Sequence, residues 1–169
     1  MRRAPGNRKG SSLLEFTLVG VPFIFVLIST FEMARGMWIY HTLTYAVKEA
    51  TRYAVVHGQN CAVSPNACTV SVGQITTRIR EAGPGLLPAD MSVTLTASNG
   101  TLNCQLSDCL NNNNVWPTAP GNAVGSDIQI SATYPFRSVI CMFWPGAGES
   151  VQSIGTFNLP AVSREPIQF

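Results

Sequence analysis

Cysteine is the residue of this chain whose chemistry depends most on its surroundings. All five cysteines follow residue 60, namely Cys61, Cys68, Cys104, Cys109 and Cys141. In an oxidising compartment such residues form disulfides. We expect Cys61 to pair with Cys68 and Cys104 with Cys109, since each pair brackets a short stretch, although the sequence leaves other pairings open. Cys141, inside an apolar run, is expected to be a buried thiol.

Other site chemistry is disfavoured by the residues present. A zinc site would have to combine His57, Cys61 and Cys68, and no fourth ligand stands at a usual spacing. A cysteine hydrolase would need a histidine after residue 58, and both histidines precede it. Glu32 and Arg35 are expected to be an interfacial pair or solvated charges. We therefore predict a protein that is not an enzyme and that uses no cofactor and no metal.

Charge is unevenly distributed along the chain. Its 169 residues suit one modest domain with appendages. Charged residues make up 12%, against about 25% in soluble domains, and a net charge of +2 does not indicate nucleic-acid binding. Four of the eleven basic residues fall in the first nine positions: Arg2, Arg3, Arg8 and Lys9. This asymmetry points to a membrane topology signal.

An apolar segment directly follows these cations. Residues 13–31 carry a single charge, Glu15, and as a helix they extend about 28 Å, close to the thickness of a bilayer's hydrocarbon core. The positive-inside rule places the N-terminus in the cytoplasm and everything after Phe31 across the membrane. The segment is longer than the core of a secretory signal, no A-x-A-like site follows it, and the first cysteine comes too late for a lipoprotein.

Processing on the cytoplasmic side fits instead. Residues 10–16 (GSSLLEF) resemble the prepilin cleavage motif of the tight-adherence pilus system, in which a glycine precedes the cut and a glutamate with a following aromatic residue comes soon after it. Residues 31–36 (FEMARG) and 45–55 (YAVKEATRYAV) are similar to segments of the TadE-like minor pilins, and Pro22 interrupts the apolar run. The resemblance covers roughly residues 10–58.

The resemblance implies a structural subunit cut between Gly10 and Ser11. Its partners would be a prepilin peptidase, the major pilin and other minor pilins, and an inner-membrane assembly platform with its ATPase. It would be a single-pass protein of the bacterial inner membrane with a periplasmic C-terminal part, able to enter the extracellular pilus and so to serve cell adhesion and biofilm formation. The rival interpretation is a signal-anchored periplasmic binding protein that is not part of a pilus.

Three residues in the apolar segment have expected roles. A carboxylate in a membrane helix costs about 2.5–3.5 kcal/mol at the bilayer centre and less near an end, so Glu15 should have a partner. By analogy with pilins, the new α-amine of Ser11 on a neighbouring subunit would pair with it and set axial register; otherwise Glu15 reaches the headgroups. Gly20 and Pro22 predict a kink, which membrane helices tolerate.

The helix is expected to continue past the membrane to His57. Residues 32–57 carry an apolar stripe at helical spacing, made of Met33, Met37, Tyr40, Leu43, Val47, Ala50 and Ala54. Such a stripe could dock on the chain's own globular part, on other helices, or on both. Gly58 is a plausible stop.

The remaining residues, 58–169, are rich in Asn, Ser, Thr, Gly and Pro. They predict a possible short strand at 69–72, a short helix at 72–82, strands at 91–97 and 127–134, and a weaker strand at 153–159 that resumes after Pro160. Residues 99–125 are expected to form a loop.

The domain organisation follows from these elements. We predict an α+β protein with a cytoplasmic leader at 1–10 and a long helix at 11–57. That helix is transmembrane at about 13–31 and amphipathic at 32–57. A small antiparallel β-rich periplasmic head at 58–169 completes the chain.

Overall fold

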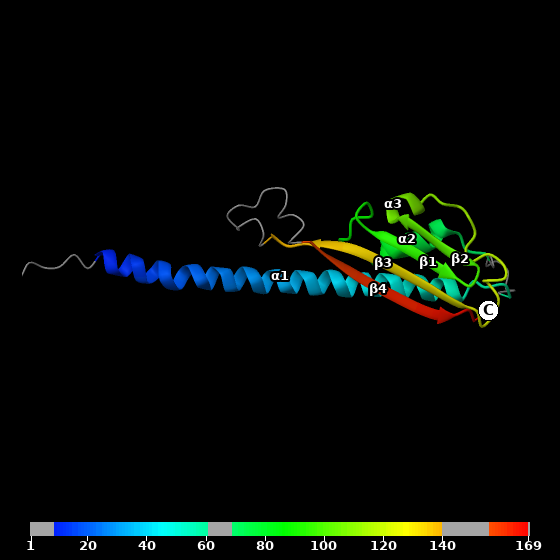
Figure 1. The fold of residues 1–169 in the computed structure, drawn as a ribbon, viewed down its shortest axis with the longest axis horizontal. Helices are drawn as coiled ribbons and strands as arrows, with labels where there is room; N and C mark the ends of the chain where they lie inside the picture. Colours follow the sequence, from blue (N-terminus) through cyan, green and yellow to red (C-terminus); the bar gives the residue numbers. More distant parts are fainter. Residues whose placement is uncertain (1–8, 61–68, 140–155, 169) are drawn as a thin grey trace, which may run out of the picture.

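A computed structural model of the protein describes residues 9–60, 69–139 and 156–168, with side chains from residue 13 onward. It has the predicted α+β architecture, a long N-terminal helix beside a small antiparallel sheet (Figure 1). The N-terminal part of the helix extends away from the head, and its C-terminal part lies under the sheet.

Helix α1 (Lys9–Val55) is continuous over 47 residues. It passes through Gly20 and Pro22 without ending, so the proline is accommodated as in other membrane-type helices. A kink at this point stays a prediction. The helix stops close to where the sequence indicated, two residues before His57 and ahead of the buried Gly58.

Four strands form one antiparallel sheet in the order β2-β1-β3-β4. They are β1 (Ser92–Ala97), β2 (Gly100–Gln105), β3 (Asp127–Arg137) and β4 (Thr156–Pro166). β1 and β2 form a hairpin in which Ala97 lies opposite Gly100, and β3 and β4 pair along their whole lengths. Alternate residues of β1 and β3 are buried, because one face of the sheet packs on the helices.

The core lies between that face and two helices. α2 (Val72–Ala82) packs on α1, and α1 also packs on β3 and β4. A capping box starts α2: Ser71 Oγ accepts a hydrogen bond from the Gln74 amide, and Gln74 Oε1 accepts one from the Ser71 amide. The cap explains why residues 69–72 do not form the expected strand. Only Ser71 makes an isolated bridge, to Val115.

The apolar stripe expected on α1 docks on the head along only part of its length. Leu43, Val47, Ala50 and Ala54 are fully buried against the sheet and α2, as docking on the chain's own globular part requires. Met33, Met37 and Tyr40 are exposed instead. Nearer the membrane the face toward the sheet runs through Gly36 and Ile39, which are partly buried.

Three strand predictions also need correction. β2 lies inside residues 99–125, which were expected to form a loop. β3 does not end before Pro135 but runs to Arg137. β1 begins at Ser92, opposite Thr133, so Pro135 lies where β3 has a neighbouring strand on one side only. β4 runs through Pro160, which an edge strand tolerates because half of its amides are unpaired.

Candidate assembly site

The first half of α1 has no cover from the described part of its own chain. One helix in the described part of the chain is long and apolar enough to cross a membrane, and none of its most apolar window is buried by the head. Phe16, Leu18, Phe23 and Phe31 are all more than half exposed. A helix with apolar side chains all round its circumference belongs in a bilayer or inside an assembly.

Three hydroxyl groups in this apolar stretch are satisfied within the helix. The hydroxyl of Thr17 donates to the carbonyl of Leu14 at 3.0 Å, and the hydroxyls of Ser29 and Thr30 each donate to a carbonyl one turn back at 2.8 Å. These bonds remove the cost of placing hydroxyls in hydrocarbon. These three hydroxyls are therefore compatible with a bilayer.

The residues of the expected cleavage site lie at the beginning of α1. The helix starts at Lys9, so the backbone of Gly10 and Ser11 falls in its first turn. Glu15 follows one turn later on the exposed helix surface. Cleavage between Gly10 and Ser11 would bring an α-amine to the same end of the helix as this carboxylate.

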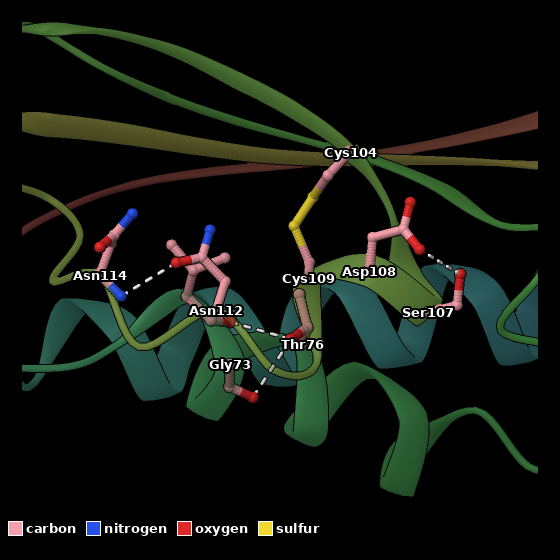
Figure 2. The surroundings of a disulfide bond; sticks show 9 residues. Gly73, Thr76, Cys104, Ser107, Asp108, Cys109, Asn112 and Asn114 are labelled. Atoms are coloured by element: carbon pink, nitrogen blue, oxygen red, sulfur yellow. Dashed lines mark hydrogen bonds between the residues drawn. A yellow bond between two sulfur atoms is a disulfide. The ribbon is translucent and has the colours of Figure 1, made fainter.

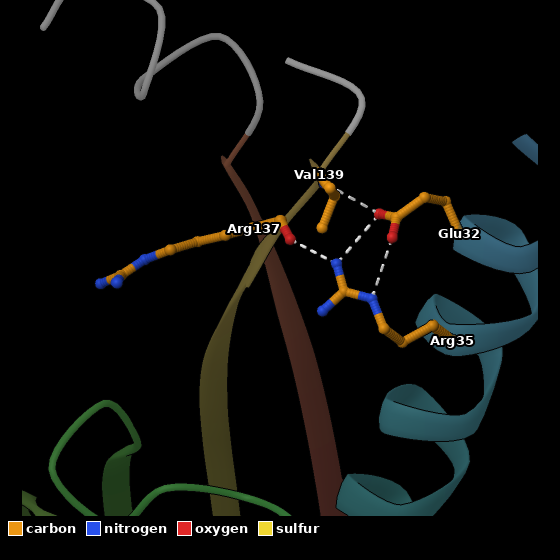
Figure 3. A network of polar contacts seen from close by, with 4 residues as sticks. All are labelled: Glu32, Arg35, Arg137 and Val139. Carbon is orange, nitrogen blue, oxygen red and sulfur yellow. Dashed lines mark hydrogen bonds and ion pairs between the residues drawn. The ribbon is translucent and has the colours of Figure 1, made fainter. Parts of the chain in front are cut away.

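A polar network fastens the head to α1 just beyond the apolar segment (Figure 3). The guanidinium of Arg35 donates to both carboxylate oxygens of Glu32, at 3.2 and 2.9 Å, and also to the carbonyl of Arg137. The amide of Val139 donates to Glu32 at 3.1 Å. The Arg35 guanidinium also lies 4.5 Å from the centre of the Phe136 ring. The end of β3 is thus held at the membrane-proximal end of the head.

Glu32 is suited to this role because it stays ionised. Its side chain is 13% exposed. The hydrogen bond from the Arg35 side chain is the main reason that the pKa of Glu32 lies below its usual value, and the bond from the Val139 amide acts in the same direction against the effect of burial. The expectation of an interfacial pair agrees with this geometry. The partners Arg137 and Val139, at and just after the end of β3 and more than a hundred residues away, could not be foreseen from sequence.

One of the two expected disulfides lies within the described residues. Cys104, on β2, is bonded to Cys109 in the short helix α3 (Leu106–Cys109), with 6.1 Å between their Cα atoms (Figure 2). Cys61, Cys68 and Cys141 lie outside the described residues. The bridge holds the turn after β2. The loop that follows α3 passes next to the start of α2.

That loop closes the N-terminal end of α2. The carbonyls of Asn112 and Asn114 accept hydrogen bonds from the amides of Gly73 and Val72, at 2.8 and 2.9 Å. A Cβ on Gly73 would lie 2.8 Å from the Leu110 carbonyl oxygen, so only glycine fits there. The asparagine-rich stretch is therefore a structural support of the head.

Fold and site together define a class: an α+β protein anchored by an N-terminal helix whose exposed half suits a membrane or a helical assembly. Residues 10–52 match the family model described as TadE-like protein, which confirms the resemblance seen in the sequence. A TadE-like segment indicates a protein associated with tight-adherence pili. No curated protein and no solved structure matches the chain significantly.

Proposed function

We propose that this protein is a minor pilin or pseudopilin of a tight-adherence type IV pilus. It is a structural subunit without catalytic activity, cut by a prepilin peptidase between Gly10 and Ser11. It then enters the pilus or primes its assembly. Its N-terminus faces the cytoplasm and its head the periplasm. Its partners are the peptidase, the other pilins and the inner-membrane platform.

The observation that carries this proposal is the coincidence of three features on one helix. The TadE-like match begins at Gly10, the residue before the expected cut. The apolar stretch that follows has no cover from the described part of its own chain. The same helix then continues into the core of the head, where Leu43 and Val47 are fully buried. A subunit built this way transmits a position set among membrane helices directly to its head.

Glu15 has a specific part in this proposal. The charge of an ionised carboxylate in hydrocarbon is costly unless a positive group is near. Removal of the leader creates such a group, the α-amine of Ser11. In an assembly the amine of one subunit neutralises Glu15 of its neighbour and rewards one axial register. Cleavage then acts as the switch that permits assembly.

The mature N-terminus tests the proposal. The protein should be isolated from cells with and without their prepilin peptidase, and its intact mass and N-terminal sequence determined. We expect a chain that begins at Ser11 only where the peptidase is present. Replacing Gly10 with a bulkier residue (Gly10→Val) should block the cut, whereas Gly20→Ala, a glycine change inside the helix, should leave it intact. A chain that keeps its leader in both strains would refute the pilin function and favour the signal-anchored periplasmic protein.

A further inference from the structure

The end of the head that lies nearest the apolar segment is held at a defined height on α1. The amide of Val139 donates to the carboxylate of Glu32 at 3.1 Å. The carbonyl of Arg137 accepts a hydrogen bond from the guanidinium of Arg35. Glu32 directly follows Phe31, the last residue of the expected membrane segment, and Arg35 comes three residues later. β3 therefore ends beside the turn of α1 that follows the apolar segment (Figure 3).

That height coincides with the headgroup layer of a bilayer. A helix rises about 1.5 Å per residue, so Glu32 and Arg35 lie about 2 Å and about 6 Å beyond Phe31 along α1. The headgroup layer on each side of the hydrocarbon core is about 5–8 Å thick. The hydrocarbon does not extend far past Phe31, because the ionised Glu32–Arg35 pair would be costly in it. The backbone groups that this pair holds therefore lie among the lipid headgroups.

Two apolar side chains are exposed at this end of the head. The side chain of Val139 is 43% exposed, and that of Phe157, near the start of β4, is 59% exposed. Phe157 lies opposite Phe136 in the sheet, and the Phe136 ring lies against the Arg35 guanidinium, so Phe157 is also close to the height of Arg35. Apolar side chains at this height can be buried at the boundary between headgroups and acyl chains, which is favourable.

Arg137 supplies an exposed cation at the same height. Its side chain is 73% exposed and extends away from α1 (Figure 3), and the carboxylate of Asp90 lies 3.9 Å from its guanidinium. An ion pair of this length and exposure contributes little. The guanidinium is therefore available to a phosphate group, which its planar set of donors fits.

The balance of charge suits an ordinary phospholipid. The described charged side chains at this end of the head are Glu32, Arg35, Asp90 and Arg137, and their formal charges sum to zero. A surface without net charge does not select for anionic lipids. A zwitterionic phospholipid has the same balance and carries the phosphate that Arg137 would bind. The ligand that these groups fit is therefore the phosphate-bearing headgroup that all phospholipids share.

We propose that this end of the head rests on the headgroup layer of the membrane that α1 enters, with Val139 and Phe157 inserted among the lipids and Arg137 bound to a phosphate. The contact sets the height and the orientation of the sheet on the bilayer before any other subunit is present. This inference rests on the proposed function only in taking α1 as a membrane-spanning helix. It needs neither the cut at Gly10 nor the pilus.

Photo-crosslinking in vesicles tests the contact. The full chain, with Val139 replaced by p-benzoylphenylalanine, is reconstituted in phosphatidylcholine vesicles, irradiated and analysed by intact mass. We expect an adduct that is heavier by one phospholipid. The matched control carries the same replacement at Val56, which is 40% exposed and directly follows the other end of α1, and it should give no lipid adduct. Absence of an adduct at Val139, or equal adducts from both positions, would overturn the proposal.

Charge reversal measures the part that Arg137 plays. Arg137→Glu should lower the yield of the Val139 lipid adduct about threefold, because lipid phosphates repel a carboxylate. The matched control is Arg164→Glu, which should leave the yield unchanged. Arg164 is 64% exposed on β4, and its carboxylate neighbour is Asp127, at the other end of the sheet. Equal yields from the two variants would exclude the phosphate contact.

An alkaline wash of the vesicles separates this inference from the proposed function. The protein should be retained, since α1 is inserted in the bilayer. A protein that washes off would contradict both proposals, because both require the inserted helix. A retained protein that keeps its leader in cells would contradict only the pilin function, whereas a retained protein without the Val139 adduct would contradict only the headgroup contact.

Discussion

At the scale of single residues, the Glu32–Arg35 pair is the most informative feature of the molecule. A charge pair three residues apart on a helix usually contributes little when it is exposed to water. Here the carboxylate also accepts the Val139 amide, and the guanidinium also donates to the Arg137 carbonyl. The pair thereby satisfies backbone groups at the end of β3 and joins the head to α1 at the membrane-proximal end of the head.

Replacing Glu32 with glutamine should destabilise the head by about 1 kcal/mol, because a neutral amide replaces the charged acceptor of the Arg35 bonds. The measurement is chemical unfolding of the protein in detergent. The pKa of Glu32 is lower in the folded state than its ordinary value of 4.5. Its stabilising contribution is therefore present above pH 4.5 and is lost as the pH falls through the folded-state pKa.

The difference between the wild-type protein and Glu32→Gln should therefore shrink as the pH is lowered below 4.5. Arg35→Lys serves as a graded control, since lysine keeps the charge but cannot donate two parallel bonds to the carboxylate. A difference between wild type and Glu32→Gln that is the same at pH 7 and at pH 3 would show that the charge of Glu32 has no part in the fastening.

At the scale of elements, the continuous helix α1 has three different environments along its length and around its circumference. Its first half is exposed all round, as a bilayer or a bundle of helices requires. Its second half has one side buried under β3 and β4 and flanked by α2. Its opposite side carries Trp38 and Tyr45 into an open groove beside α2. The same element therefore provides the apolar segment, contributes to the core of the head and lines the groove beside α2.

Leu43 and Met37, two apolar residues of similar size on α1, distinguish the side of the helix that packs on the sheet from the exposed side. Leu43 is fully buried, and Leu43→Ala should lower the free energy of unfolding of the head by about 2–4 kcal/mol through lost contacts and the cavity left behind. Met37 is 58% exposed, so Met37→Ala should change the free energy of unfolding by less than about 0.5 kcal/mol. Thermal or chemical unfolding measures both. Equal losses from the two variants would mean that α1 docks in another orientation.

At the scale of the whole molecule, α1 (Lys9–Val55) joins the exposed apolar segment to the sheet of the head as one uninterrupted helix. The same helix packs on β3 and β4. The disulfide between Cys104 and Cys109 keeps the far part of the head compact by closing the turn after β2.

Glu15 is predicted to matter for assembly and not for processing. Glu15→Gln keeps the shape of the side chain but removes the charge that would pair with the α-amine of a neighbouring Ser11. We expect normal cleavage after Gly10 and loss of the protein from sheared surface fibres, measured by N-terminal mass and by immunoblotting of the fibre fraction. Glu165→Gln, on β4 of the head, is the charge-matched control and should retain incorporation. Normal incorporation of Glu15→Gln would exclude the register role.

The sequence by itself determined the features that depend on local pattern and composition. Each of these features is specified by neighbouring residues and could therefore be predicted. They are the apolar run at 13–31, the motif around Gly10, the helix at 72–82 and the alternating strand at 91–97. The same is true of the Cys104–Cys109 pair, whose members are separated by only a short turn.

Only the tertiary structure decided the remaining features, because they depend on contacts between distant segments. β2 forms in an asparagine-rich stretch because β1 offers it a pairing edge, and Pro160 is accepted because β4 is an edge strand. The side of α1 that docks is chosen by the sheet, which buries Leu43 and leaves Met37 exposed. Glu32 meets Val139 across 107 residues, a contact that no local pattern encodes.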